Sequence, residues 1–226
     1  MNFKQRSYKK ELLDGTDIPF AAIKRNMQEL NTINTLLGGH AITVNGFRQL
    51  ATDNDCHICE IGCGGGDNLL AVAKACKFPL QLTGIDLNAD CIEVAATTLK
   101  NYEAVLTVSD YKAVQWQQAQ PDIIFSSLFC HHFTNEELVS QLQWMQQHST
   151  KGFFINDLHR HWLAYYSIKW LTALFSKSYL VKNDAPLSVR RGLRRKEWKD
   201  LLERAGIKNY SIQWKWAFRW LIVVRK

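Results

Sequence analysis

Four glycines stand close together directly after a short apolar run, in the stretch HICEIGCGGGDNLL at residues 57–70. They are Gly62, Gly64, Gly65 and Gly66. Glycine adopts positive φ angles without steric cost and leaves the backbone open to close approach by a ligand. A helix that begins near Asp67 would add unpaired N–H groups at its N-terminus. The stretch therefore predicts a loop whose backbone contacts a ligand, since a plain strand-to-helix turn needs only one or two glycines.

The spacing of the glycines narrows the kind of ligand. A dinucleotide-binding loop has glycines at its first, third and sixth positions, but the sixth position here is Asp67, whose negative charge would lie beside a pyrophosphate. A phosphate-binding loop that ends in Gly-Lys-Ser/Thr is also absent from the sequence. An adenosine-type ligand without a phosphate chain is therefore favoured. Asp86, twenty residues after Gly66, is placed to accept both ribose hydroxyls. Alternatively, it is an acidic residue at the N-terminus of the next helix.

The elements around this loop alternate between strand and helix. Such alternation is typical of a parallel sheet covered on both faces. Strands are predicted at 57–61, 80–86, 104–109, 121–129 and 152–157, with helices at 67–77, 89–100 and 135–147. Two last strands, at 208–216 and 218–226, are so near each other in sequence that they predict an antiparallel hairpin. The predicted fold class is α/β, with a doubly wound, mostly parallel seven-stranded sheet that ends in this hairpin.

Three further segments flank the predicted sheet. Residues 18–37 read as a helix that stops at Gly38-Gly39. Residues 161–181 read as one long helix rich in aromatic side chains. The stretch NDAPLSVRRGLRRKEW, residues 183–198, is predicted to be an arginine-rich loop that leads into a helix at 195–205.

Composition places the chain among globular proteins. Its 226 residues fit one domain with a sizeable core, and 46% of them are hydrophobic. A run of 18 uncharged apolar residues and the apolar middle of a signal peptide are both missing, so a cytoplasmic location is expected. The net charge of +7 divides into −5 over residues 1–150 and +12 over residues 151–226. A basic C-terminal third fits nucleic acid, an anionic membrane surface, an acidic substrate or simply a solvated face.

The motifs EIGCGGG, GIDLN and SDY follow one another along the chain and resemble those of class I S-adenosylmethionine-dependent methyltransferases. The resemblance covers roughly residues 40–226. It implies S-adenosylmethionine as the cofactor, with the methionine end on the glycine loop, the ribose on Asp86, and the adenine beside Asp110 and Tyr111. The cofactor-binding residues expected from it are Glu60, Gly62, Cys63, Gly64, Gly66, Asp67, Asn68, Asp86, Leu87, Asp110, Tyr111 and Ser126. It also implies a helical lid at 1–50 and a core at 51–226, with an acceptor-binding insertion at 158–195.

Histidines follow the fourth and fifth predicted strands. Methyl transfer is an in-line displacement at a sulfonium, so the acceptor atom must be aligned with the methyl group. A hydroxyl acceptor must also lose a proton, and imidazole is suited to take it near neutral pH. We expect His132 to be this base, with His131 and His159 as the alternatives.

Six cysteines raise the question of a metal. Cys56, Cys59 and Cys63 lie close together with His57 nearby. However, the first two lie in or beside a predicted buried strand and point to opposite faces, while a metal at Cys63 would displace the ligand of the glycine loop. We expect buried, reduced thiols and no metal site.

An aromatic stripe follows the fifth strand. Trp162, Tyr165, Tyr166 and Trp170 have helical spacing and share one face, which forms either core or an acceptor pocket. The residues expected to bind the acceptor are Phe129, Trp162, Tyr165, Tyr166, Arg190 and Arg191. We predict O-methylation of a small aromatic or lipophilic hydroxyl compound.

The sequence leaves three alternatives to this function open. They are C-methylation of a quinone-type ring, RNA methylation with the basic C-terminal third, and cofactor binding without catalysis. Nucleic acid is not the expected partner, because no RNA-binding module is visible and SSLF replaces the Asn/Asp-Pro-Pro-aromatic motif after the fourth strand. Contact of residues 161–181 with a membrane surface and the oligomeric state are left open.

Overall fold

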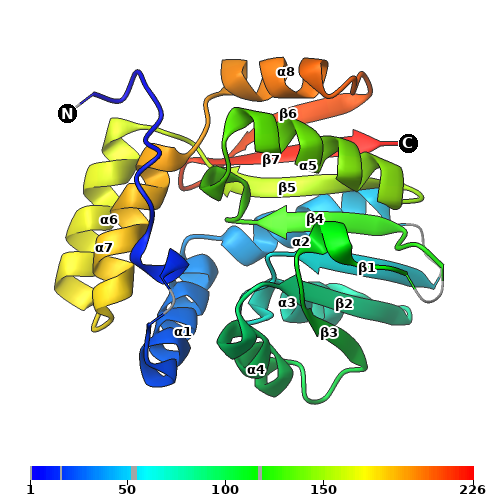
Figure 1. Ribbon diagram of the computed structural model, residues 1–226, viewed down its shortest axis with the longest axis horizontal. Helices are drawn as coiled ribbons and strands as arrows, with labels where there is room; N and C mark the ends of the chain where they lie inside the picture. Colours follow the sequence, from blue (N-terminus) through cyan, green and yellow to red (C-terminus); the bar gives the residue numbers. More distant parts are fainter. Residues whose placement is uncertain (1, 16, 52–54, 117–118) are drawn as a thin grey trace.

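A seven-stranded sheet forms the centre of the molecule in a computed structural model that describes residues 2–15, 17–51, 55–116 and 119–226. The strands are β1 (Cys56–Ile61), β2 (Leu80–Asp86), β3 (Ala104–Val108), β4 (Ile123–Ser127), β5 (Gly152–Leu158), β6 (Tyr210–Lys215) and β7 (Arg219–Arg225). Their order across the sheet is β3-β2-β1-β4-β5-β7-β6 (Figure 1). Strands β1 to β5 run parallel, whereas β7 is antiparallel to both β5 and β6. The predicted fold class, including the closing hairpin, is confirmed.

Helices cover both faces of this sheet. They are α1 (Phe20–Leu36), α2 (Gly39–Leu50), α3 (Asp67–Ala75), α4 (Ala89–Thr98), α5 (Asn135–His148), α6 (Trp162–Phe175), α7 (Tyr179–Arg191) and α8 (Arg195–Arg204). The parallel strands are apolar on both faces, as buried parallel strands must be. On β1, for example, Ile58 packs in the core under α2 and α3, while Cys59 packs in the core under α5 and α8.

The order of the strands determines where a ligand can bind. From β1 the chain builds outward through β2 and β3, then returns to add β4 on the other side of β1. In such sheets the crevice for ligands lies outside the carboxyl ends of the strands on either side of this reversal. Figure 1 shows α1, α6, α7 and the N-terminal segment gathered at the end toward which β4 points.

The segment after β5 differs from the sequence prediction. It is not one helix over 161–181, because α6 ends at Phe175 and a new helix, α7, begins at Tyr179. The Ser178 side chain accepts a hydrogen bond from the N–H of Val181 and so caps the start of α7. The predicted loop at 183–198 is also wrong in its first half, since α7 continues through Pro186 to Arg191. Buried apolar side chains on α7 outweigh the usual cost of a proline in a helix.

The N-terminal 50 residues contribute in two ways. Helix α2 packs directly on the sheet, with Ile42, Phe47 and Leu50 in the same core cluster as Phe154. The segment before α1 contains a short 3-10 helix, η1 (Leu12–Asp14), which contacts α7. Helix α1 and η1, and not α2, are therefore the N-terminal elements that can cover a ligand. The predicted domain boundaries at residue 50 and at residues 158–195 stay predictions. Within the described residues, every helix is too short or too polar to cross a membrane.

Candidate active site

The glycine loop between β1 and α3 has the backbone that its sequence predicts. Gly62, Gly64 and Gly66 have φ angles of +67°, +51° and +75°, a region that side chains with a Cβ rarely adopt. A Cβ atom on Gly62 would clash with the Phe129 ring, so the loop also needs glycine for close packing.

Asp86 joins this loop to the end of β2. Its carboxylate accepts hydrogen bonds from the N–H groups of Gly64 and Asn88, each at 2.9 Å. Burial raises the pKa of Asp86 above its ordinary value, and these hydrogen bonds only partly oppose the effect. The side chain is thus fixed beside the loop, with lone pairs left for a ligand hydroxyl.

Glu60, at the end of β1, lies buried under the loop. Neither of its carboxylate oxygens has a hydrogen-bond partner among the described residues. Burial, with the carboxylates of Asp67 and Asp86 nearby, raises its pKa well above the ordinary value, and the neighbouring Leu69 N–H and Asn68 side chain oppose this only in part. A buried acceptor without a donor is costly, so this position favours a ligand that brings N–H groups or a positive charge.

Polar residues from three further elements meet at the start of α3. Asp67 lies 2.7 Å from His40 Nε2 and accepts a hydrogen bond from the Asn34 amide at 3.3 Å. Arg219, at the start of β7, donates to the Asn34 side-chain oxygen at 2.8 Å. The Nε and Nη1 atoms of Arg219 have no partner within the described part of the chain, although the side chain is buried. This guanidinium is available to an anion in the cavity.

One cavity of about 1460 Å³ connects these groups. Cofactor pockets usually measure about 300–1,000 Å³, so this cavity has room for a cofactor and a second molecule. The loop, Asp86, Asp110 and Tyr111 line one part of it. Apolar side chains from α1, α6, α7 and the β6–β7 turn line the rest.

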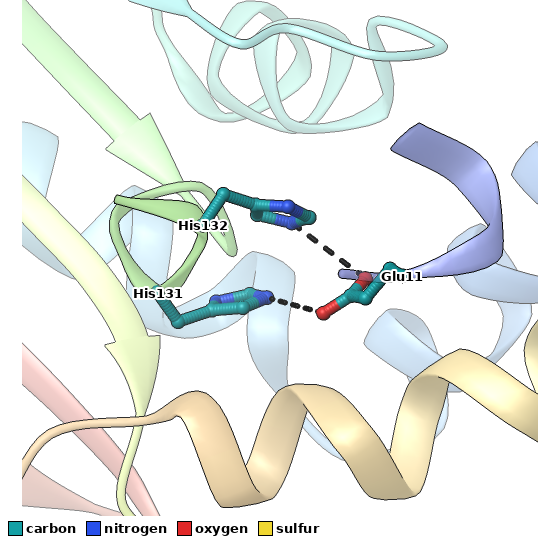
Figure 2. A group of neighbouring side chains, drawn as sticks. All are labelled: Glu11, His131 and His132. Atoms are coloured by element: carbon teal, nitrogen blue, oxygen red, sulfur yellow. Dashed lines mark ion pairs between the residues drawn. The ribbon is translucent and has the colours of Figure 1, made fainter. Parts of the chain in front are cut away.

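Two histidines also line the cavity. His131 and His132 belong to η3 (Cys130–His132), directly after β4, and both point toward Glu11 from the N-terminal segment (Figure 2). His131 Nε2 lies 3.5 Å and His132 Nε2 lies 3.7 Å from a Glu11 carboxylate oxygen. Within the residues that the structure describes, these three are the group that could hold a metal ion.

The two imidazoles differ in environment. His131 is buried and its Nδ1 lies 2.7 Å from Asp157, at the end of β5. Burial lowers its pKa, but the carboxylates of Asp157 and Glu11 outweigh this effect and raise it to about 9. His131 is therefore protonated at neutral pH in the metal-free protein. His132 is less buried, and its Nδ1 lies 3.2 Å from Asp14.

The remaining residues predicted to bind the cofactor have varied positions. Cys63, Asn68 and Leu87 line the cavity, and Phe129, predicted to bind the acceptor, lines it too. Ser126 is buried on β4 against Cys130, and its neighbour Ser127 lines the cavity instead.

Most of the residues predicted to bind the acceptor point elsewhere. Trp162, Tyr165, Tyr166, Arg190 and also His159 do not line the cavity. The face of α6 that does so carries Leu163, Ala164, Ser167, Ile168 and Leu171. Arg191 lines the cavity, but its guanidinium donates to the backbone oxygens of His131, His132 and Lys9.

Sequence reasoning missed several cavity residues. Trp214 at the end of β6, and Trp216 and Phe218 in the β6–β7 turn, line the cavity, whereas the sequence predicted only a hairpin here. Glu11 precedes every predicted element, and Arg219 begins the last strand without belonging to a motif. A search for isolated charged residues at strand ends would have found Arg219, but no local signal identifies Glu11.

Comparisons with known proteins agree with this fold. Residues 58–152 match the family described as "Methyltransferase domain". Among solved structures, the plantazolicin methyltransferase BpumL in complex with SAH is 17% identical over 92% of this chain and 95% of that chain, with a TM-score of 0.66. BpumL in complex with a triazolic desmethylPZN analog and SAH gives 18% identity, 91% of each chain and a TM-score of 0.66.

A second enzyme shares the fold at lower similarity. Magnesium protoporphyrin IX methyltransferase (ChlM) from Synechocystis PCC 6803 with bound SAH is 12% identical over 94% of this chain and 90% of that chain, with a TM-score of 0.52. No curated protein matches the chain by sequence. The solved structures confirm the expected fold, and the family match covers residues 58–152 of it.

Proposed function

We propose that this chain, a class I methyltransferase by its fold and by its methyltransferase domain at residues 58–152, methylates the oxygen of a small lipophilic hydroxyl compound with S-adenosylmethionine. One observation carries the proposal. A single cavity is lined by the glycine loop, Asp86, His132 and apolar side chains of α1, α6 and α7, and its volume suits two ligands.

The cofactor residues follow from the polar groups along the loop. Asp86 would hold the ribose hydroxyls, and Asp110 and Tyr111 would lie beside the adenine. Glu60 and Asp67 suit the ammonium group of the methionine moiety, because both are acidic and Glu60 has no donor in the described structure. Arg219 suits the methionine carboxylate, since two of its buried nitrogen atoms have no partner there. Charged hydrogen bonds of this kind are among the strong ones.

The transfer step needs a proton acceptor beside the methyl group. The hydroxyl oxygen attacks the methyl carbon, the carbon–sulfur bond breaks, and S-adenosylhomocysteine leaves as the neutral thioether. In this proposal the hydroxyl proton goes to His132, whose imidazole is oriented by Asp14. His131 is less suited, because the carboxylates around it keep it protonated. His159 is less suited because it lies off the cavity.

RNA is a weaker candidate for the acceptor. Several cations of the basic C-terminal third are engaged inside the protein: Arg160 pairs with Glu197, Arg191 binds backbone oxygens, and Arg219 is buried. The excess positive charge of residues 151–226 is therefore only partly available to phosphates. The acceptor compartment is lined mainly by aliphatic and aromatic side chains, which favours a lipophilic molecule.

The outer surface of α6 supports the same acceptor class. Trp170, Leu174 and Phe175 are 68%, 71% and 79% exposed, an unusual concentration of apolar surface. Leu163 and Leu171 are partly exposed and also line the cavity. With Lys169 on the same helix, this face suits the interfacial region of an anionic membrane, from which a lipophilic acceptor would reach the cavity.

The test is transfer of a labelled methyl group from S-adenosylmethionine to a panel of phenols, quinols and total RNA. Label on the oxygen of a phenol supports the proposal. Label on a ring carbon of a quinol would mean that the reaction is C-methylation and not O-methylation. Label in RNA contradicts it. His132→Gln should then lower turnover by about 10²–10⁴-fold with unchanged cofactor affinity, because it removes the base and not the binding site.

A further inference from the structure

We infer that Glu11, His131 and His132 form a binding site for a divalent transition-metal ion such as Zn²⁺. The Nε2 atoms of both imidazoles and a carboxylate oxygen of Glu11 lie within 4.8 Å of one another. The three side chains converge from two segments more than a hundred residues apart, as Figure 2 shows.

The spacing of the three ligand atoms is close to that of a tetrahedral site. With metal–ligand bonds of about 2.0–2.1 Å, two ligand atoms lie roughly 3.3 Å apart. His131 Nε2 is 3.5 Å from Glu11 Oε1, and His132 Nε2 is 3.7 Å from Glu11 Oε2. One ligand atom from each of the three residues lies within 4.8 Å of the others, so side-chain rotations would be enough to bring them into coordination.

The other nitrogen of each imidazole is held by a carboxylate. His131 Nδ1 lies 2.7 Å from Asp157, and His132 Nδ1 lies 3.2 Å from Asp14. Histidines that bind metals usually donate their second N–H to a carboxylate or a carbonyl, which fixes the tautomer and leaves the Nε2 lone pair for the metal. Both histidines have this arrangement, and both Nε2 atoms face the Glu11 carboxylate. His131 would release its Nε2 proton when the metal binds.

The charge of the surroundings is compatible with a cation. Glu11, Asp14 and Asp157 supply three negative charges. Two arginines lie near them: Arg191 Nε is 4.0 Å from Glu11, and Arg6 donates to the His131 backbone oxygen at 2.9 Å. With neutral imidazoles the cluster keeps one net negative charge. Arg191 also donates to the backbone oxygens of His131 and His132, so it helps to orient the two ligands.

The ligand types select among metals. Two imidazoles and one carboxylate suit Zn²⁺ and other first-row transition ions, whereas Mg²⁺ and Ca²⁺ prefer oxygen ligands. Three protein ligands leave an open position, and all three residues line the cavity. An acceptor hydroxyl bound there would have a lowered pKa and would lose its proton to solvent water, which leaves the oxygen to attack the methyl group. This role of the metal rests on the proposed function: His132 would be the base in the metal-free protein and a ligand when the metal is bound.

Metal binding can be measured without any methyl transfer. Chelator-treated protein is titrated with Zn²⁺ against a chromophoric competitor, and with Co²⁺ followed by its visible absorption. We expect one equivalent to bind, without the charge-transfer band that a cysteine ligand would give. Glu11→Gln and His132→Gln should each weaken Zn²⁺ binding by more than about 100-fold. Asp157→Asn, which removes only an outer partner, should weaken it by roughly 10–100-fold.

The control is His161→Asn, which removes an imidazole outside the cavity and keeps a side chain able to cap α6. It should bind Zn²⁺ like the unchanged protein. Circular dichroism and cofactor affinity report whether each variant is folded. Absence of binding, or binding that the Glu11 and His132 variants leave unchanged, would overturn the inference. Zn²⁺ binding with no methyl transfer to any acceptor would instead contradict the proposed function alone.

Discussion

The Asp86 carboxylate fixes the surrounding backbone and is also expected to bind the ribose, so Asp86 is the most informative single residue for cofactor binding. It accepts hydrogen bonds from N–H groups of the glycine loop and of the start of α4, and these bonds hold both segments beside the cavity. Asp86→Asn should weaken S-adenosylmethionine binding by about 10- to 100-fold, since a hydrogen bond to a charged group contributes about 1.5–3 kcal/mol. Isothermal titration calorimetry measures this. The matched control is Glu93→Gln, which lies on α4 but does not line the cavity. Equal affinities of the two variants for S-adenosylmethionine would contradict the assignment of the ribose to Asp86.

His159 shows how burial and neighbouring positive charges lower the pKa of an imidazole. Its Nδ1 has no hydrogen-bond partner in the described residues, and its ring packs against Trp220. Burial, together with the positive charges of His161 and Arg194, lowers its pKa from 6.5 to about 4. The unfolded chain therefore binds a proton that the folded protein does not hold, and the free energy of unfolding should fall as the pH falls from 6.5 to 4. Urea unfolding across this range should show a smaller fall in His159→Gln, and an identical fall would contradict the assignment.

At the scale of elements, the β1–α3 loop contains two separable constraints: backbone conformation and packing. Gly62 has a φ of +67° and lies against Phe129, whereas Gly206, after α8, has a φ of +77° with no atom within 4 Å of a Cβ. Gly206→Ala should therefore lower the free energy of unfolding by about 1–2 kcal/mol from conformation alone. Gly62→Ala should cost about 1–3 kcal/mol more, because Phe129 must move. Urea unfolding of both variants tests this, and equal losses would mean that the Phe129 ring turns aside freely.

The helices and strands differ in how well the sequence alone predicts them. Strands, core helices and the glycine loop follow from local alternation and motif, and their predicted positions agree with the structure to within a few residues. Helix α7 was missed because Asn183, Asp184 and Pro186 are typical of loops, while its stability comes from packing against other elements. The aromatic spacing on α6 predicted a shared face but gave no information about which way that face would point.

The candidate site divides in the same way. Asp86 could be predicted, because it follows the loop in a recognisable series. Glu11 could not, since its partner is distant in sequence: it binds Ser188 across 177 positions. Arg219 stands out as an isolated charge at a strand end, but its pairing with Asn34 across 185 positions could not be predicted. Such contacts are set by the packing of whole elements, which no local pattern encodes.

At the scale of the whole molecule, one end carries both the cavity and the most apolar surface. Helices α1, α6 and α7 meet there, and the N-terminal segment is tied across them by Glu11 and by the N–H groups of Leu12 and Leu13, which donate to Asp184. Leu36 on α1 and Trp216 in the β6–β7 turn are also largely exposed, and Trp216 lines the cavity. A lipophilic acceptor would thus enter the cavity from the most apolar side of the molecule, where exposure to water is least favourable.

This arrangement predicts that the protein binds to anionic lipid vesicles through α6. Phe175 and Leu174 would insert among the acyl chains, Trp170 would lie at the interface, and Lys169 and Lys177 would face the headgroups. Phe175→Ser should lower the vesicle partition coefficient by about tenfold, since burial of such a side chain contributes about 1.5–3 kcal/mol. Tyr102→Ser, a comparable loss of a partly exposed ring on the loop after α4, should leave it unchanged.

Co-sedimentation with vesicles at two salt concentrations measures both contributions. Raising the salt should weaken binding by screening the lysines, while the effect of Phe175→Ser should persist, because burial of apolar surface is not screened. The other explanation for an apolar face is self-association, which light scattering distinguishes. If the protein forms a dimer that Phe175→Ser dissociates, and vesicles do not retain it, then α6 is an interface between two copies and the acceptor must reach the cavity from water.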